Sequence, residues 1–286
     1  MNLLITGVWA EAEKYIPEIE AKGHQVLFLQ QEKDELPCRP DWVEGVICGG
    51  LFLFHPIEAF VNLKYIQLTS AGYDHMPMEY VKAHPIEFHN AHGVYSVPMA
   101  EFAIAGVLSV FKKLNVFYEQ QKKHEWKKDR NLRELAGKTV VIVGCGEVGA
   151  ECAKRFKAFD TTVIGVNRTM KDQPFFDQMV DLDKIDRILE TADVVVIAIA
   201  LSEETRGLVK ARQLKKGALL VNVSRGAVVD LDGVQNAFLD VFENEPLEEN
   251  DPLWDTDNIL ITPHNSFAGD RNDNRLSRLI LSNLKV

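Results

Sequence analysis

A glycine-rich segment in the middle of the chain could bind the phosphates of a nucleotide. It has the spacing GxGxxG, follows an apolar run directly and precedes an amphipathic stretch at 150–159. In such a motif the first glycine allows a tight turn, the second lets a pyrophosphate approach the backbone, and the third permits close packing of a helix on a strand. The free N–H groups at the helix start favour the phosphates. The alternative is a purely structural turn, but a strand before the motif and a helix after it favour dinucleotide binding. The residues are Gly144, Cys145, Gly146, Glu147, Val148 and Gly149.

The residues that would recognise the ribose of the dinucleotide are expected about 20 positions beyond the glycines, at the end of the next apolar run. An acidic side chain there would bond the 2′-hydroxyl and repel a 2′-phosphate, but the chain has Asn167, Arg168, Thr169 and Lys171. These neutral, cationic and hydroxyl-bearing side chains favour NADP(H) over NAD(H). The alternative is that Arg168 only stacks on the adenine, so that both cofactors are accepted.

Three segments in the last third of the chain carry charged or titratable groups beside apolar runs. Arg225 follows the apolar run 218–222, which places it at the carboxyl edge where α/β sheets bind ligands. Glu245 supplies a carboxylate before a proline, and His264 follows a proline in Thr262-Pro263-His264-Asn265. Taken singly, such an arginine is usually part of a surface ion pair and a Glu-Pro is usually a loop.

The motifs GCGEVG, NVSRG, LDVFENEP and TPHNSF, in this order, resemble those of the D-isomer-specific 2-hydroxyacid dehydrogenases. That family includes phosphoglycerate dehydrogenase and the glyoxylate/hydroxypyruvate reductases, and the likeness covers most of the chain. It implies that Arg225 binds the substrate carboxylate and polarises the keto oxygen. It also implies that His264 donates a proton to the carbonyl oxygen as hydride arrives at carbon, and that Glu245 holds the imidazole in its protonated form. Asp240 resembles the aspartate that faces the nicotinamide carboxamide. The remaining cofactor contacts expected here are Val223, Ser224, Arg225 and His264.

The same resemblance identifies a substrate loop at 69–74. The backbone N–H groups of Ala71 and Gly72 would bind the second face of the substrate carboxylate. Gly50 and Leu51 follow another apolar run and would line the same cleft, whose apolar character favours a small or hydrophobic side group on the substrate. Tyr95 is a weaker candidate for the same pocket, and the other histidines are assigned structural roles.

Short apolar runs alternate with amphipathic stretches, which predicts parallel sheets with helices on both faces. The segment 97–126 is expected to be one long helix with Pro98 in its first turn. We therefore predict an α/β protein of two Rossmann-like or flavodoxin-like doubly wound domains with a cleft between them. Residues 1–95 plus 267–286 would bind substrate, and residues 96–266 would bind the dinucleotide. Strands are expected at 3–6, 25–29, 45–48, 65–68, 139–143, 162–166, 194–198 and 218–222, and early helices near 11–22 and 56–61.

The chain departs from the family pattern in two places. Between Arg225 and Glu245 about nine residues are missing by resemblance, enough to remove the helical crossover that a parallel strand requires. A true deletion would shorten a central strand and could pull Glu245 and Asp240 out of register. The other interpretation, which the intact flanking motifs favour, is that residues are missing from the sequence as recorded. The C-terminal helix also looks clipped at residue 286.

Composition narrows the class of protein. The net charge of −10 argues against a general nucleic-acid binder, and no apolar run reaches the roughly 18 residues of a membrane span. The cysteines, Cys38, Cys48, Cys145 and Cys152, have no CxxC or zinc spacing, so we expect reduced thiols, no metal site and a cytoplasmic location.

The sequence thus predicts an oxidoreductase that transfers hydride between NAD(P)H and a small 2-keto or D-2-hydroxy acid, with NADPH-linked reduction favoured. The family implies a homodimer built on the 97–126 helix. Two alternatives stay open: an NAD-dependent dehydrogenase of the phosphoglycerate type, and a corepressor-like sensor that binds NAD(H) without turnover. The Arg225, Glu245 and His264 set argues against a sensor, which needs no proton donor.

Overall fold

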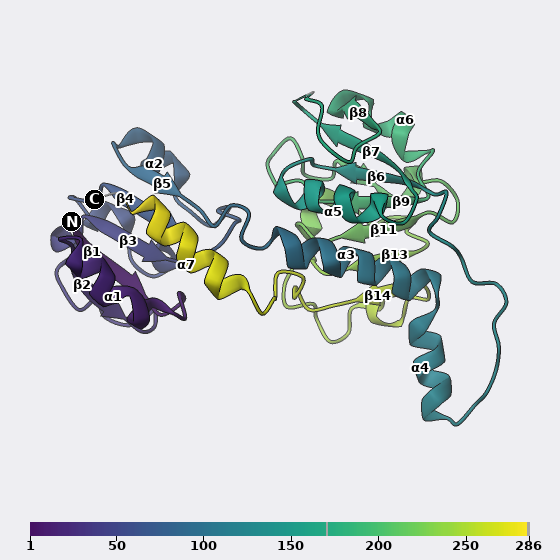
Figure 1. Ribbon diagram of the computed structural model, residues 1–286, viewed down its shortest axis with the longest axis horizontal. Coiled ribbons are helices and arrows are strands. Elements are labelled where there is room, and N and C mark those ends of the chain that lie inside the picture. The colour runs from purple at the N-terminus through teal and green to yellow at the C-terminus, as the bar shows by residue number, and fades with distance from the viewer. Residues whose placement is uncertain (170, 285–286) are drawn as a thin grey trace. The chain divides into compact units, whose positions relative to one another are not determined.

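The computed structural model describes residues 1–169 and 171–284, and it divides into two compact units (Figure 1). Met1–Tyr95 and Gly269–Val286 belong to the first unit, and Ser96–Ala268 forms the second. Both units are built on parallel sheets, which confirms the predicted fold class. Among the described residues, no helix combines the length and apolar character needed to cross a bilayer.

The sheet of the first unit has the strand order β2-β1-β3-β4-β5. Strand β1 pairs on both sides, with Leu3 opposite Val26 of β2 and Gly45 of β3. This order reverses direction between β1 and β3, so the loops after these two strands diverge at the carboxyl edge. The strands are β1 (Asn2–Thr6), β2 (Gln25–Leu29), β3 (Gly45–Cys48), β4 (Tyr65–Leu68) and β5 (Glu87–His89), and the helices are α1 (Ala12–Ala21), α2 (Met78–Ala83) and α7 (Asn272–Asn283).

The last helix, α7, belongs to the first unit although it lies at the other end of the chain. Leu276 and Ile280 pack into the cluster formed by Leu3 and Ile5 of β1. The buried indole of Trp9 donates a 2.9 Å hydrogen bond to Ser277 Oγ. Apolar packing and this hydrogen bond together hold α7 against the sheet.

The sheet of the second unit has the strand order β14-β13-β11-β9-β6-β7-β8, and a small parallel pair, β10 with β12, lies beside it. The β-branched run 139–143 becomes β6, an interior strand that is buried on both faces. The main strands are β6 (Thr139–Val143), β7 (Thr162–Asn167), β8 (Gln178–Asp181), β9 (Val194–Ile197), β11 (Leu219–Asn222), β13 (Ala237–Leu239) and β14 (Ile259–Ile261). The other elements are β10 (Val209–Lys210), β12 (Val229–Asp230), α3 (Ser96–Phe111), α4 (Leu114–Lys122), α5 (Glu147–Lys157) and α6 (Ile185–Leu189).

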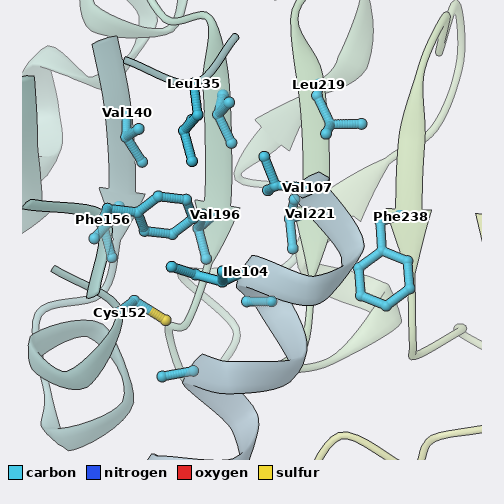
Figure 2. Packing of buried hydrophobic residues seen from close by; sticks show 14 of the residues in the cluster. Ile104, Val107, Leu135, Val140, Cys152, Phe156, Val196, Leu219, Val221 and Phe238 are labelled. Carbon is cyan, nitrogen blue, oxygen red and sulfur yellow. The ribbon is translucent and has the colours of Figure 1, made fainter. Parts of the chain in front are cut away.

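Helices α3 and α5 cover one face of this sheet (Figure 2). Phe156 of α5 packs with Val140 and Val196, while Ile104 of α3 lies in the same cluster. Gly106 allows α3 to approach the sheet closely, because a Cβ there would lie 2.0 Å from the ring of Phe238 on β13. The position of β13 therefore depends on α3.

The prediction of one long helix over 97–126 is wrong at its middle. Pro98 does lie in the first turn of α3, but α3 ends at Phe111 and α4 begins at Leu114, with Lys113 between them at φ 52°. The returning segment causes the break: Arg133 N–H donates to Phe111 O at 3.1 Å, and Lys113 Nζ contacts Asp129 Oδ2 at 2.6 Å. Helix α4 consequently extends away from the sheet (Figure 1).

Two other segments also differ from the sequence prediction. The helix expected near 56–61 is only a 3₁₀ turn at Ile57–Ala59. The connection from β11 to β13 contains no α-helix: residues 223–236 make the crossover with a 3₁₀ turn (Gly226–Val228) and β12. A segment of this length satisfies the dozen or so residues that a parallel connection needs. Strand β13 pairs with β11 and β14, with Phe238 opposite Val221 and Leu260.

Candidate active site

The glycine segment forms the loop between β6 and α5, and its three glycines lie in different steric environments. Gly144 has φ 94°, and a Cβ on Gly149 would lie 2.0 Å from Gly144 O. Gly146 caps α5 in an extended conformation and faces open space, because no atom lies within 4 Å of a Cβ built there in the described chain. Glu147 is exposed and Val148 is half-buried. The loop thus leaves an open approach to the N-terminus of α5, which fits a pyrophosphate.

The residues expected to recognise the ribose lie at the end of β7 and directly after it. Asn167 Nδ2 donates to Thr169 O at 3.1 Å, which fixes the turn. The Arg168 guanidinium is two-thirds exposed and forms an ion pair with Glu204, which follows β9. Gln173 Nε2 donates to Cys145 O at 2.9 Å and ties this segment to the glycine loop. Lys171 lies beside these residues and is exposed.

The loop after β11 presents Arg225. Asn222, buried at the end of β11, accepts from Ser224 N–H at 3.1 Å and donates to Arg225 O at 2.9 Å. The Arg225 side chain is half-buried and donates from Nη1 to Ser224 O at 2.9 Å. Val223 is buried beneath this loop. The guanidinium therefore lies on a hydrogen-bonded turn at the carboxyl edge of the sheet.

His264 and Glu245 meet in the structure. His264 Nδ1 lies 2.7 Å from Glu245 Oε2, while the other carboxylate oxygen accepts from Phe242 N–H at 2.8 Å. A carboxylate only accepts, so Nδ1 carries the proton in this pair. In the described residues no hydrogen-bond partner faces Nε2, and the imidazole is 40% exposed. The free nitrogen can therefore exchange a proton with a bound molecule.

Asp240 holds the loop on which His264 lies. The Asp240 side chain is fully buried, and its Oδ1 accepts from Thr262 Oγ1 at 2.6 Å and from Asn265 N–H at 2.9 Å. Its Oδ2 accepts from Ser266 N–H at 2.8 Å, and His264 N–H donates to Asp240 O at 2.8 Å. His264 has φ 49°, a left-handed conformation that costs free energy outside glycine. The Asp240 contacts offset that strain.

Strand order brings these groups to one edge. Arg225 follows β11, Asp240 follows β13 and His264 follows β14, and these strands are consecutive and parallel in the sheet. Neighbouring strands lie about 4.8 Å apart, so the backbones of the three loops start within roughly 10 Å of one another. The spacing in sequence gave no sign of Thr262 and Ser266 as supports for Asp240.

The turn at residues 69–72 of the first unit was predicted to bind the substrate carboxylate. Its carbonyl groups are held by side chains: Tyr95 OH donates to Thr69 O, Asn90 Nδ2 to Ala71 O at 2.6 Å, and Ser70 Oγ to Gly72 O at 2.8 Å. In the described residues the N–H groups of Ala71 and Gly72 have no acceptor. Two free N–H groups on a turn whose carbonyls are pinned form a site for a carboxylate. Burial, and to a smaller extent Asp273, raise the pKa of Tyr95, so its hydroxyl stays a donor.

Gly50 and Leu51 lie in a different environment from the one expected. Gly49 N–H and Gly50 N–H each donate at 2.6 Å to the carboxylate of the buried Glu32, and Leu51 lies fully inside the core. The side chains that this loop presents to solvent are Leu53 and Phe54. A contact of Gly50 and Leu51 with substrate stays a prediction.

Known proteins resemble the chain over both units. A family model described as the NAD-binding domain of D-isomer specific 2-hydroxyacid dehydrogenases matches residues 104–266. A glyoxylate reductase of Thermofilum pendens is 32% identical over 247 residues, which are 80% of this chain and 73% of that protein. The crystal structure of a D-isomer specific 2-hydroxyacid dehydrogenase family protein from Aeromonas salmonicida has 28% identity and a TM-score of 0.84, covering 99% of this chain and 94% of that one. A D-isomer specific 2-hydroxyacid dehydrogenase from Xanthobacter autotrophicus, solved in complex with NADPH and MES, has 26% identity and a TM-score of 0.77, covering 98% of this chain and 92% of that one.

Proposed function

The chain belongs to the D-isomer specific 2-hydroxyacid dehydrogenase family, and we propose that it reduces a small 2-keto acid to the D-2-hydroxy acid with NADPH. The coarser activity, NAD(P)-linked hydride transfer on 2-hydroxy or 2-keto acids, follows from membership of the family. The observation that carries the proposal is the 2.7 Å contact between His264 Nδ1 and Glu245 Oε2. It leaves His264 Nε2 to donate a proton at the moment when an alkoxide would form.

In this proposal the residues of the second unit have separate roles in reducing the keto acid. When bound, the nicotinamide supplies the hydride. Arg225 binds the carboxylate of the substrate with its planar fork and polarises the keto group. His264 protonates the developing alkoxide oxygen, and Glu245 stabilises the imidazolium before that transfer. Asp240 keeps His264 in place through the 262–266 loop.

In the first unit, taken by itself, the turn at residues 69–72 is the proposed carboxylate-binding segment. The N–H groups of Ala71 and Gly72 bind the substrate carboxylate, and Asn90 and Tyr95 hold the turn that carries them.

The cofactor preference is proposed from the residues after β7. None of Asn167, Arg168 and Thr169 is acidic. A 2′-phosphate would therefore meet the cation Arg168, where an NAD-binding site would have a carboxylate that binds the ribose. The relative from Xanthobacter autotrophicus, solved with NADPH, supports the same choice.

The test is a panel of 2-keto acids assayed with NADPH and with NADH. We expect His264→Ala to lose about 100-fold or more of kcat while NADPH binding stays unchanged. His84→Ala is the matched control, since His84 is exposed and its ring bonds to Tyr80 O and stacks on the Tyr80 ring. If His264→Ala turned over as fast as His84→Ala, His264 would have no part in the mechanism. Nucleotide binding without turnover of any member of the panel would favour a sensor.

We also propose a homodimer in which α4 and the segment after it contact a second copy. Leu114 and Tyr118 on α4 are more than half exposed, and Trp126 is 92% exposed. Exposed apolar patches of this kind mark interfaces between proteins. Leu114→Asp should shift the mass measured by light scattering from dimer to monomer, while Gln31→Asp, an exposed change in the first unit, should leave it unchanged. The cytoplasmic location stays a prediction of the sequence.

A further inference from the structure

We infer that Glu204 sets how strongly the protein selects a 2′-phosphorylated cofactor, because it competes with the 2′-phosphate for Arg168. This inference rests on the NADPH preference proposed above and names the residue that limits it. No sequence pattern indicates this contact, because Glu204 lies 36 positions from Arg168.

The ion pair lies across the dinucleotide loop. Arg168 follows β7 and Glu204 follows β9, and these two strands flank β6, which leads into Gly144. The Arg168 to Glu204 pair therefore joins the loops on either side of the glycine segment, all at the carboxyl edge of the sheet. A nucleotide that lies along the glycines brings its adenosine end to this pair.

Glu204 is held in place by an ordered turn. Thr205, only 3% exposed, accepts from Ser202 N–H at 2.7 Å and donates to Ala200 O at 2.8 Å. Arg206 N–H closes the turn on Ser202 O at 3.0 Å. Glu204 consequently lies inside a turn that Thr205 and Arg206 close on Ser202, and its carboxylate pairs with Arg168.

The same guanidinium is the proposed partner of the phosphate. A carboxylate and a phosphate both occupy the donor fork of an arginine. NADPH must therefore displace Glu204 from Arg168 and keep its phosphate near a like charge, whereas NADH brings no phosphate to that point. Breaking an exposed ion pair and placing the phosphate near a like charge in solvent each cost little free energy of NADPH binding. Together they should lower the preference for NADPH over NADH about five-fold.

The experiment compares Glu204→Gln with Glu203→Gln, which removes the same charge one residue away. In the described residues Glu203 contacts no cation. We expect Glu204→Gln to raise the ratio of kcat/KM for NADPH over NADH about five-fold, and Glu203→Gln to leave it unchanged. Calorimetric titration gives a second readout without turnover: Glu204→Gln should bind adenosine 2′,5′-bisphosphate about five-fold more tightly, and 5′-AMP as the wild type does. Both gains should vanish near 1 M salt, because the groups are exposed to solvent.

Arg168→Gln separates the failure of this inference from the failure of the proposed cofactor. If Arg168→Gln lowers the NADPH preference but Glu204→Gln behaves like Glu203→Gln, the role of Glu204 is refuted and the proposed function stands. If Arg168→Gln leaves the preference unchanged, the proposed NADPH preference falls, and the role of Glu204 falls with it.

Discussion

Replacing Gly146 with alanine should weaken cofactor binding strongly without unfolding the protein. Gly146 has φ −76° and ψ −162°, a conformation open to any L-residue, and a Cβ there meets no atom within 4 Å. Alanine is a poorer N-cap than glycine, which costs up to about 1 kcal/mol of stability. Alanine also reduces the conformational entropy of the unfolded chain, which stabilises the fold by about 0.4–1 kcal/mol. The two terms nearly cancel, so Tm should change by less than about 3 °C.

The effect on binding should be much larger. The new methyl group occupies the space through which a pyrophosphate reaches the N-terminus of α5, a contact worth up to about 2 kcal/mol for a charge in favourable geometry. Loss of that contact weakens NADPH binding about 30-fold. Calorimetric titration of NADPH measures the affinity, and differential scanning calorimetry measures Tm on the same samples.

Two other glycines provide the controls. Gly149→Ala should destabilise the fold by about 3 kcal/mol, because the Cβ would lie 2.0 Å from Gly144 O. Gly137→Ala, at φ 73° and also facing open space, should lower stability by about 1 kcal/mol and leave NADPH affinity intact. Wild-type affinity in Gly146→Ala would refute the assignment of this loop to the pyrophosphate, and a large fall in Tm would refute the claim that the space beside Gly146 is open.

Three further predictions test other parts of the molecule. Asp240→Asn places an amide N–H against backbone N–H donors. We expect kcat to fall at least about 10-fold in steady-state kinetics and the free energy of unfolding to fall by about 1–3 kcal/mol in urea titration. Unchanged values in both would contradict the role of Asp240 in holding His264. Burial raises the pKa of Cys145 and of Cys152 to about 12, so of these two thiols and the half-buried Cys38, iodoacetamide at pH 8 should modify only Cys38. Peptide mapping that found Cys145 or Cys152 labelled in the native protein would count against their burial. Burial of Asp193 acts to raise its pKa, but hydrogen bonds from Lys215 and from Thr139 N–H outweigh it and lower the pKa, so the wild type should exceed Asp193→Asn in unfolding free energy above about pH 4. That advantage should shrink as the pH falls through the lowered pKa, and a gap that stayed constant from pH 7 to pH 2 would contradict this assignment.

The strands and the glycine loop could be predicted because they depend on local sequence. The run at 139–143 is rich in β-branched residues, which favour a buried strand wherever the run lies in a sheet. The contact that requires glycine at 149 is with Gly144 O, in the same loop. The elements that were mispredicted depend on distant contacts. Nothing within 97–126 indicates the break at Lys113, because the hydrogen bond that ends α3 comes from Arg133.

The site follows the same rule. The pairing of Glu245 with His264 was expected from the family motifs, and the structure brings the two side chains together. The contact between Glu204 and Arg168 was not expected, because it requires the strand order β9-β6-β7 to bring two loops together. The Glu32 carboxylate on the Gly49 and Gly50 N–H groups likewise joins loops of different strands. Sequence patterns identify which residues carry the chemistry, whereas the partners that orient them depend on topology.

The connection between β11 and β13 contains no crossover helix, yet β13 keeps its pairing register with β11 and β14. Val228 and Val229 in that connection pack on Leu220 of β11 and so cover the face where a helix would lie. On strand β13, Phe238 faces α3 while its neighbours on either side face the connection. A slip of one residue would exchange these faces and bury Phe238 against the wrong layer. The close approach of Gly106 to Phe238 therefore fixes the point at which β13 ends, and with it the direction in which Asp240 leaves the sheet to hold His264.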